Sequence, residues 1–370
     1  MNQVYYKINM NIRLSGGKNM SIVEHSFGTT KSGIEVKSYT LTNKNKMEVK
    51  IITYGGAIVE INAPDKNDNF SDVILGYDSI EGYENGKKFH GALIGRCGNR
   101  IKDSRFTINN EEYVLVANDG VNHLHGGRKG FDKVVWDAEI IDDENNILKL
   151  SYLSKDGEEG YPGNLNVNVF YSLTADNEIK IEYRAVSDKD TVVNLTNHAY
   201  FNLRGHSSGD ILDQKLMVNA DNFTVNDRYS IPTGEIRSVE NTPMNFKELK
   251  AIGENINDQD EQIEFGQGYD HNWLLNSKGD LSVLSAKLVD EVSGRVMEMY
   301  TTNVGVQVYS GNFLDGSEIG KNNVAYEKRS GVCLETQFVP NAINDNNFET
   351  SLLKANDEYR HTTIYKFTTI

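Results

Sequence analysis

The sequence predicts an all-β protein, a large antiparallel β-sandwich with a few short helices. From Val36 onward, short segments rich in β-branched and aromatic residues alternate with clusters of turn-forming residues, instead of with long helical patterns. Apolar and polar residues alternate within these segments, as they do in strands that bury one face. A length of 370 residues is large for one domain, but large antiparallel sandwiches accommodate such chains in one core.

The N-terminal residues differ from the rest of the chain. Residues 1–20 are polar and contain Gly16 and Gly17, and the strand pattern begins only after Met20. We therefore expect a loose N-terminal extension over residues 1–20. Because no Pro/Ser linker, low-complexity tract or fixed-period repeat follows, we expect residues 21–370 to form a single domain.

The clearest pair of strands lies near the middle of the chain. Residues 165–173 and 179–185 each alternate apolar and polar side chains, and a turn-forming segment at 174–178 separates them. This arrangement predicts a β-hairpin or meander. Further strands are expected at residues 114–116, 148–153, 281–288, 296–300, 304–309 and 332–337.

The stretch 194–203 is predicted to be a strand with two different faces. Because side chains alternate along a strand, Thr196, His198 and Tyr200 share a polar face, and the leucines and Phe201 share the opposite, apolar face. The leucine spacing also suits a helix, but the asparagines and threonine of this stretch favour the strand. His198 therefore lies where a site is expected beside the core.

One helix is predicted, over residues 245–256. Phe246, Leu249 and Ile252 recur there at helical spacing, and Asn245 with Glu248 resembles a capping box. The acidic stretch that follows, residues 257–264, is expected to be a solvated loop.

Composition excludes several classes of partner. The chain has 38 basic and 53 acidic residues, a formal charge of -15, which opposes binding to nucleic acid and to anionic membranes. No apolar run is long enough for a membrane helix, and the first twenty residues lack the apolar core of a signal peptide. The two cysteines, Cys97 and Cys333, are expected to be buried thiols. We therefore predict a cytoplasmic protein.

Polar residues concentrate in five further segments. A sugar presents hydroxyls around its whole rim, so its site needs hydrogen-bonding side chains that converge from several strands. The candidates are Asn99 and Arg100 in 95–100, His125 in 122–127, Asp270 in 268–273, Gln307 in 304–309 and Glu335 in 332–337. Glu335 falls on the polar face of a strand whose other face, with Val332 and Leu334, is apolar.

The motifs that carry these residues resemble those of the aldose 1-epimerase, or galactose mutarotase, family. They occur in the family's order, at residues 95–101, 124–127 with 130–136, 194–203, 269–272, 311–316 and 334–337. One departure is Gly98, where the family commonly has alanine. The resemblance implies the galactose mutarotase-like supersandwich fold and a monosaccharide substrate bound in an open cleft.

The resemblance also implies roles for the site residues. His198 matches the general acid and Glu335 the general base, while Asn99, Arg100, His125, Tyr200, Asp270 and Gln307 are assigned to sugar binding. Opening a pyranose removes the proton of the anomeric hydroxyl and delivers one to the ring oxygen, so one carboxylate and one imidazole suffice. The expected activity is interconversion of the anomers of free aldohexoses such as galactose and glucose, with neither metal nor organic cofactor.

Several alternatives remain open at this point. His123 and His125, two residues apart on one predicted strand face, have the spacing of a metal site, although no carboxylate follows them. Arg128 and Lys129 offer charges for a phosphorylated hexose. Asp270 with Glu335 has the composition of a glycosidase carboxylate pair. A carbohydrate-binding protein without activity is the non-enzymatic alternative, since a fold does not determine a function.

Overall fold

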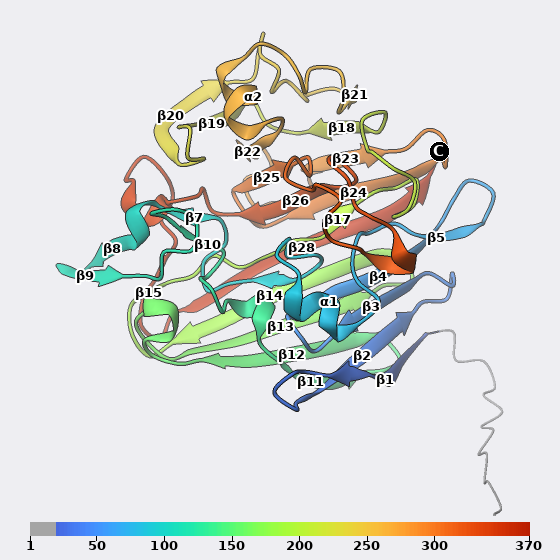
Figure 1. Ribbon diagram of the computed structural model, residues 1–370, viewed down its shortest axis with the longest axis horizontal. Coiled ribbons are helices and arrows are strands. Elements are labelled where there is room, and N and C mark those ends of the chain that lie inside the picture. The colour runs from blue at the N-terminus through green and yellow to red at the C-terminus, as the bar shows by residue number, and fades with distance from the viewer. Residues whose placement is uncertain (1–19) are drawn as a thin grey trace, which may run out of the picture.

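The computed structural model describes residues 20–370, in which strands predominate (Figure 1). These residues contain two short α-helices, α1 (Ile80–Asn85) and α2 (Glu261–Gly266), and none of their helices has the length and apolarity needed to span a bilayer. The predicted all-β class is confirmed. Residues 1–19 of the predicted N-terminal extension lie outside the described part of the chain. Short 3-10 helices lie at Lys102–Ser104, Phe131–Lys133, Glu158–Gly160, Lys321–Asn323 and Ala342–Asn344.

The largest sheet has nine antiparallel strands and contains the predicted hairpin. Strand β13 (Leu165–Leu173) buries alternate residues and pairs with β14 (Glu178–Ser187) along its whole length. The C-terminal strand β28 (Glu358–Thr369) pairs with both β14 and β24, so the last strand of the chain lies in the middle of the sheet. Across the sheet the order is β11 (Asp137–Asp142), β12 (Ile147–Ser154), β13, β14, β28, β24 (Arg295–Thr301), β23 (Ala286–Val289), β18 (Lys215–Val218) and β21 (Lys250–Ala251).

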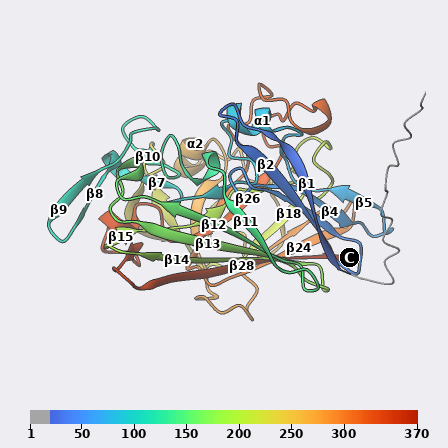
Figure 2. The same ribbon diagram turned by 90° about the horizontal axis from the view of Figure 1, so that it is seen from below.

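A second, six-stranded sheet packs on the first and carries the polar segments. Its order is β17 (Tyr200–Phe201), β26 (Val332–Gln337), β25 (Gly305–Tyr309), β22 (Asp270–Leu274), β19 (Asn222–Asn226) and β20 (Pro232–Ser238). The Tyr365 hydroxyl of β28 donates to the Leu334 carbonyl of β26 at 2.8 Å, which joins the two sheets. Figure 2 shows β13, β14 and β28 as one long layer, with the loops around α1 on the opposite side of the molecule.

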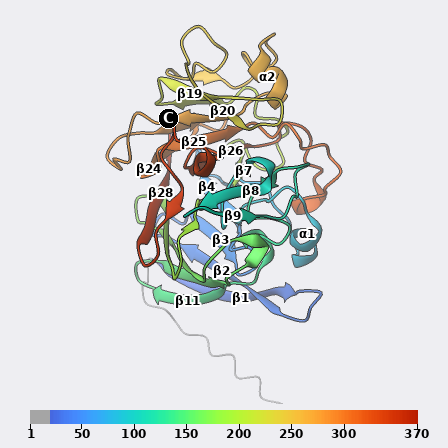
Figure 3. The same cartoon turned by 90° about the vertical axis from the view of Figure 1, so that its left-hand side faces the viewer.

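A five-stranded sheet and four two-stranded pairs complete the fold. The five-stranded sheet runs β1 (Ser21–Thr29), β2 (Glu35–Thr42), β3 (Glu48–Ile52), β4 (Ile58–Pro64), β5 (Phe70–Asp72). The pairs are β6 (Leu93–Ile94) with β16 (Thr196–Asn197), β7 (Arg100–Ile101) with β10 (His123–Leu124), β8 (Arg105–Ile108) with β9 (Glu111–Val114), and β15 (Thr191–Val192) with β27 (Leu352–Leu353). One hydrophobic cluster extends from Ile22 to Phe367. Figure 3 shows β7, β8 and β9 between the β1–β2 and β19–β20 ends of the molecule.

The predicted helix over residues 245–256 is wrong. Phe246 and Ile252 are buried, as that prediction required, but Leu249 is 44% exposed. The segment instead runs along the edge of the nine-stranded sheet, where the Phe246 carbonyl accepts a hydrogen bond from the Val218 N–H and β21 pairs with β18. Pairing with an existing strand satisfies backbone groups that a short helix would have to satisfy alone, which explains why tertiary context overrode the periodicity.

The acidic stretch at residues 257–264, predicted to be a solvated loop, instead contains the first part of α2. The Asp260 carboxylate accepts hydrogen bonds from the N–H groups of Gln262 and Ile263 and so caps the helix. Gln262 and Ile263 are both buried, which anchors this short helix.

Three predicted strands differ in extent from the structure. The segment at 281–288 becomes a strand only from Ala286, and β9 ends at Val114, so the rest of 114–116 lies outside it. The stretch 194–203 is divided into β16 and β17, with His198 between them. Every residue of this stretch is buried, so both faces lie inside the protein and alternation does not distinguish core from site there.

Candidate active site

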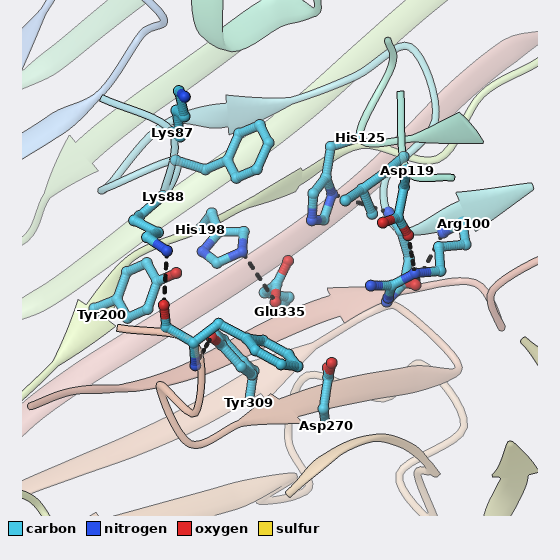
Figure 4. A pocket seen from close by; sticks show the side chains of 14 residues that line it. Lys87, Lys88, Arg100, Asp119, His125, His198, Tyr200, Asp270, Tyr309 and Glu335 are labelled. Atoms are coloured by element: carbon cyan, nitrogen blue, oxygen red, sulfur yellow. Dashed lines mark hydrogen bonds and ion pairs between the residues drawn. The ribbon is translucent and has the colours of Figure 1, made fainter. Parts of the chain in front are cut away.

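Seven of the eight predicted site residues line one cleft of about 310 Å³ (Figure 4). They come from segments far apart in the chain, and the small pairs β6–β16 and β7–β10 bring these segments to the open face of the six-stranded sheet. The seven residues are Asn99, Arg100, His125, His198, Tyr200, Asp270 and Glu335. Gln307 lies directly behind them.

Glu335 lines the cleft from strand β26, which is buried on both faces. Val332 and Leu334 belong to the main hydrophobic cluster, whereas Cys333 packs with the aromatic residues on the other face of the strand. Glu335 therefore points into the cleft, as the alternation of the strand requires. Its Oε2 atom is buried and has no hydrogen-bond partner among the described residues.

His198 and Glu335 face each other across the centre of the cleft. The distance from His198 Nε2 to Glu335 Oε1 is 3.7 Å, and both side chains are almost fully buried. Burial raises the pKa of Glu335 well above its ordinary value, with a further increase from the Asp270 carboxylate and an opposing effect of Arg100. Burial lowers the pKa of His198 to about 4. Burial thus disfavours the charged form of both groups.

The break between β16 and β17 holds His198 in place. Its N–H donates to the Ala92 carbonyl at 2.9 Å, and its carbonyl accepts from the Gly91 N–H at 3.0 Å, so its backbone is bonded to the segment before β6. The Phe89 ring stacks on the imidazole at 5.7 Å, and Cys333 Sγ lies 3.4 Å from Nδ1. These contacts orient the ring so that Nε2 points toward Glu335.

His125 is held by a reciprocal pair of hydrogen bonds with Asn99. The His125 N–H donates to the Asn99 carbonyl at 3.0 Å, and the Asn99 N–H donates to His125 Nδ1 at 3.1 Å. Because Nδ1 accepts, the proton of the neutral ring resides on Nε2. His125 therefore offers a hydrogen-bond donor to a ligand in the cleft.

His123 does not accompany His125, which corrects the prediction of one shared strand face. Strand β10 ends at Leu124, and His125 adopts a left-handed backbone conformation with φ of 51°. The His123 ring is bonded to the Val116 carbonyl at 2.7 Å and to the Tyr161 hydroxyl at 2.8 Å, away from the cleft. The turn after β10 separates the two rings, so His123 has a structural role.

The nitrogen and oxygen atoms of His125, His198 and Glu335 lie within 4.8 Å of one another, which is close enough for metal binding. A metal-bound histidine normally donates a hydrogen bond from its other ring nitrogen, which leaves a lone pair for the metal. In His125 the arrangement is the opposite, because Nδ1 accepts from the Asn99 N–H. The cluster is therefore better arranged to donate to a sugar oxygen than to hold an ion.

Two further contacts organise the polar side of the cleft. Arg100 Nε donates to Asp119 Oδ2 at 2.7 Å, and Gln307 Nε2 donates to Asp270 Oδ1 at 2.7 Å. Gln307 is thus placed to orient the Asp270 carboxylate from behind. Burial raises the pKa of Asp270, and the Arg100 guanidinium opposes this increase.

Seven cleft residues were not nominated from the sequence. Asp119 lies beside Arg100, and the exposed Lys87 and Phe313 and the half-buried Lys88 also line the cleft. The sequence indicates two of these residues weakly. Phe313 belongs to the motif 311–316, and Tyr309 shares a strand face with Gln307. The seven are Lys87, Lys88, Phe89, Asp119, Leu124, Tyr309 and Phe313.

Comparison with known proteins identifies the family. The family model described as aldose 1-epimerase matches residues 37–366. The chain belongs to the aldose 1-epimerase family. Among curated members of this family, the chain is 41% identical to galactose mutarotase from Bos taurus over 348 residues, which cover 94% of this chain and 99% of that protein. It is 37% identical to aldose 1-epimerase from Escherichia coli K12 over 330 residues, covering 89% of this chain and 94% of that one.

Solved structures of the family share the fold. Galactose 1-epimerase from Lactobacillus acidophilus superposes with a TM-score of 0.83 at 28% identity, covering 95% of this chain and 99% of that chain. The aldose epimerase homologue from C. elegans gives a TM-score of 0.82 at 26% identity, with the same coverage. These similarities confirm the predicted galactose mutarotase-like sandwich and the family resemblance read from the motifs.

Proposed function

We propose that this protein interconverts the α and β anomers of free aldohexoses, galactose and glucose among them. Family membership makes it an isomerase that acts on a monosaccharide. The observation that supports the assignment to this cleft is the imidazole of His198 placed 3.7 Å from the Glu335 carboxylate, since the reaction needs one acid and one base at adjacent oxygens of the sugar.

In the proposed reaction, Glu335 removes the proton from the anomeric hydroxyl while His198 delivers a proton to the ring oxygen. The bond between C1 and the ring oxygen breaks as the C1 carbonyl forms, which gives the open-chain aldehyde. Rotation about C1–C2 presents the other carbonyl face. The ring oxygen then attacks C1 while His198 takes back its proton and Glu335 returns a proton to O1, and the opposite anomer results.

The other cleft residues are proposed to hold the part of the sugar that does not turn. Arg100, Asp270, His125 and Asn99 line the same cleft and offer both donors and acceptors for ring hydroxyls. Gln307 supports Asp270 from behind, and Tyr200 lies beside His198. Fixing the remaining hydroxyls lets only the C1 end rotate, and orientation of this kind supplies a large share of a rate enhancement.

We also propose that residues 21–370 act as one domain in the cytoplasm. Two features support this proposal: the main hydrophobic cluster includes residues of both the first and the last strand, and Cys97 and Cys333 are buried, unpaired thiols. The charge of -15 argues against a nucleic-acid partner.

The test is polarimetric equilibration of freshly dissolved α-D-galactose and α-D-glucose. We expect the protein to accelerate both approaches to equilibrium, to the same extent with and without EDTA, because the side chains present supply both proton transfers. Boiled protein is the control for buffer catalysis. Binding of sugar without acceleration would favour the carbohydrate-binding alternative and would contradict the proposal.

The pH profile is expected to be bell-shaped, because the pair must carry one proton between its two groups. With the His198 pKa lowered to about 4, kcat/KM falls below about pH 4, where both groups are protonated. Because the pKa of Glu335 is raised, the pair loses its last proton only at a pH well above 4.5, the ordinary pKa of glutamate. There kcat/KM falls again.

The Asp270→Asn variant checks the cause of the alkaline limb. The Asp270 carboxylate raises the Glu335 pKa, so its removal is expected to move that limb to lower pH, while the limb due to His198 stays near its position. The measurement is kcat/KM against pH for both proteins. An alkaline limb that stays in place or moves upward would show that Glu335 does not carry the titrating proton.

A further inference from the structure

Two lysines that the proposed reaction does not use lie at the mouth of the cleft. Lys87 and Lys88 belong to the segment between α1 and β6 and line the cleft together with Phe313. Lys88 Nζ donates to the Phe313 carbonyl at 2.6 Å. Within residues 20–370, neither lysine has an ion pair with a carboxylate.

The nearby acids are engaged elsewhere. Glu318 accepts hydrogen bonds from the Lys87 backbone N–H and from the Tyr77 hydroxyl, and Asp315 accepts from the Ser317 N–H and hydroxyl. The Ser317 hydrogen bonds lower the pKa of Asp315, and the charge of Lys88 lowers it further, but neither lysine forms an ion pair with a described carboxylate, in a protein whose formal charge is -15. Cations at the mouth of a cleft attract an anionic ligand and can form short, charge-assisted hydrogen bonds with it.

The chemistry of the cleft determines which end of a sugar approaches these lysines. Figure 4 shows Lys88 and Tyr200 on one side of the His198–Glu335 pair and Arg100 and Asp270 on the other. With O1 at Glu335 and the ring oxygen at His198, ring atoms C2 to C4 extend toward Asp270 and Arg100. C5 is bonded to the ring oxygen, so its substituent C6 extends past His198 toward Lys88.

We propose that the cleft also accepts aldohexoses that carry an anionic group on C6. Lys88 hydrogen-bonds to this anionic group, and Lys87 contributes a second positive charge. This inference rests on the proposed anomer interconversion. The shared chemistry is an anionic oxygen on C6, which a hexuronate carboxylate and a 6-phosphate ester both present. The sequence suggested Arg128 and Lys129 for a phosphate, but both lie outside the cleft. Their backbone N–H groups donate hydrogen bonds to the Glu159 carboxylate.

The experiment compares kcat/KM for galactose, galacturonate and galactose 6-phosphate in the wild type and in Lys88→Gln, after subtraction of the rates without enzyme. Taking the ratio of anionic to neutral sugar in each variant cancels any general damage to the cleft. Loss of one charge-assisted hydrogen bond is expected to lower this ratio by roughly tenfold. Lys87→Gln is expected to lower it less, and added salt to reduce it in the wild type.

Lys129→Gln is the matched control, because it removes a lysine that lies outside the cleft, and its ratio should equal that of the wild type. If Lys88→Gln reduced the ratio for galacturonate alone, the anion site at Lys88 would be specific for a carboxylate. If it reduced the ratio for galactose 6-phosphate alone, the site would be specific for a phosphate ester. An unchanged ratio in Lys88→Gln, or acceleration of galactose with neither anion accelerated, would overturn the inference and leave the proposed function intact. No acceleration of any of the three sugars would overturn both.

Discussion

Replacing Glu335 with glutamine is expected to lower kcat for anomer interconversion by about 10³-fold, with a much smaller change in KM. Glutamine keeps the shape of the side chain but cannot take the proton from the anomeric hydroxyl, and general acid–base catalysis contributes at about this level. The measurement is polarimetric kinetics on galactose. Because Glu335 and His198 act together, adding His198→Gln to Glu335→Gln is expected to produce little further loss.

Glu298→Gln is the matched control for this prediction. Glu298 is also a strand glutamate, on β24, but its carboxylate is bonded to Lys287 and the Tyr300 hydroxyl and lies outside the cleft. Its removal should leave kcat unchanged. If Glu335→Gln kept more than about a tenth of the wild-type kcat, another group would have to remove the proton of the anomeric hydroxyl. Loss of the general base should lower kcat far more than tenfold.

Replacing Arg96 with methionine is expected to destabilise the protein by about 3–5 kcal/mol, a loss typical of disrupting a buried charged network. Arg96 is 2% exposed and is not part of the cleft. It donates to the Ser154 hydroxyl and to the carbonyls of Pro162 and Gly163, among other acceptors. Methionine fills the volume but leaves these buried acceptors unpaired.

The check is the free energy of unfolding in urea, with Arg105→Met as the control. The Arg105 side chain forms an exposed ion pair with Glu112 and an exposed hydrogen bond from Nε to the Asp103 carbonyl at 3.4 Å, so its replacement should change the free energy of unfolding by about 0.5 kcal/mol or less. Equal denaturation midpoints for Arg96→Met and the wild type would show that the Arg96 network is not needed for stability.

The local pattern was sufficient where a strand buries one face. In β13 and β14 the alternation of apolar and polar residues predicted both strands and the turn between them, and the pairing in the structure follows that pattern. The same pattern fails over 194–203, because the chain there is buried on both sides and changes partner at His198. Alternation reports which residues share a face, and it carries no information on what covers that face.

The motifs determined which residues to consider, and the structure determined how they are combined. Order and spacing identified the family, and with it the roles proposed for His198 and Glu335. Packing of β25 against β22 placed Gln307 behind Asp270 instead of in the cleft, and the turn after β10 separated His123 from His125. Neither result follows from spacing along the chain, since each depends on contacts between distant segments.

The sequence alone therefore determined the all-β class, the central hairpin and the residue types needed for acid–base chemistry, because these depend on local alternation and on motifs within single segments. Only the tertiary structure decided that 245–256 joins a sheet edge, that Asp119 pairs with Arg100, and that Lys87 and Lys88 reach the mouth of the cleft. The physical reason is that burial, charge compensation and backbone pairing are properties of neighbours in space, and these neighbours lie far apart in the chain.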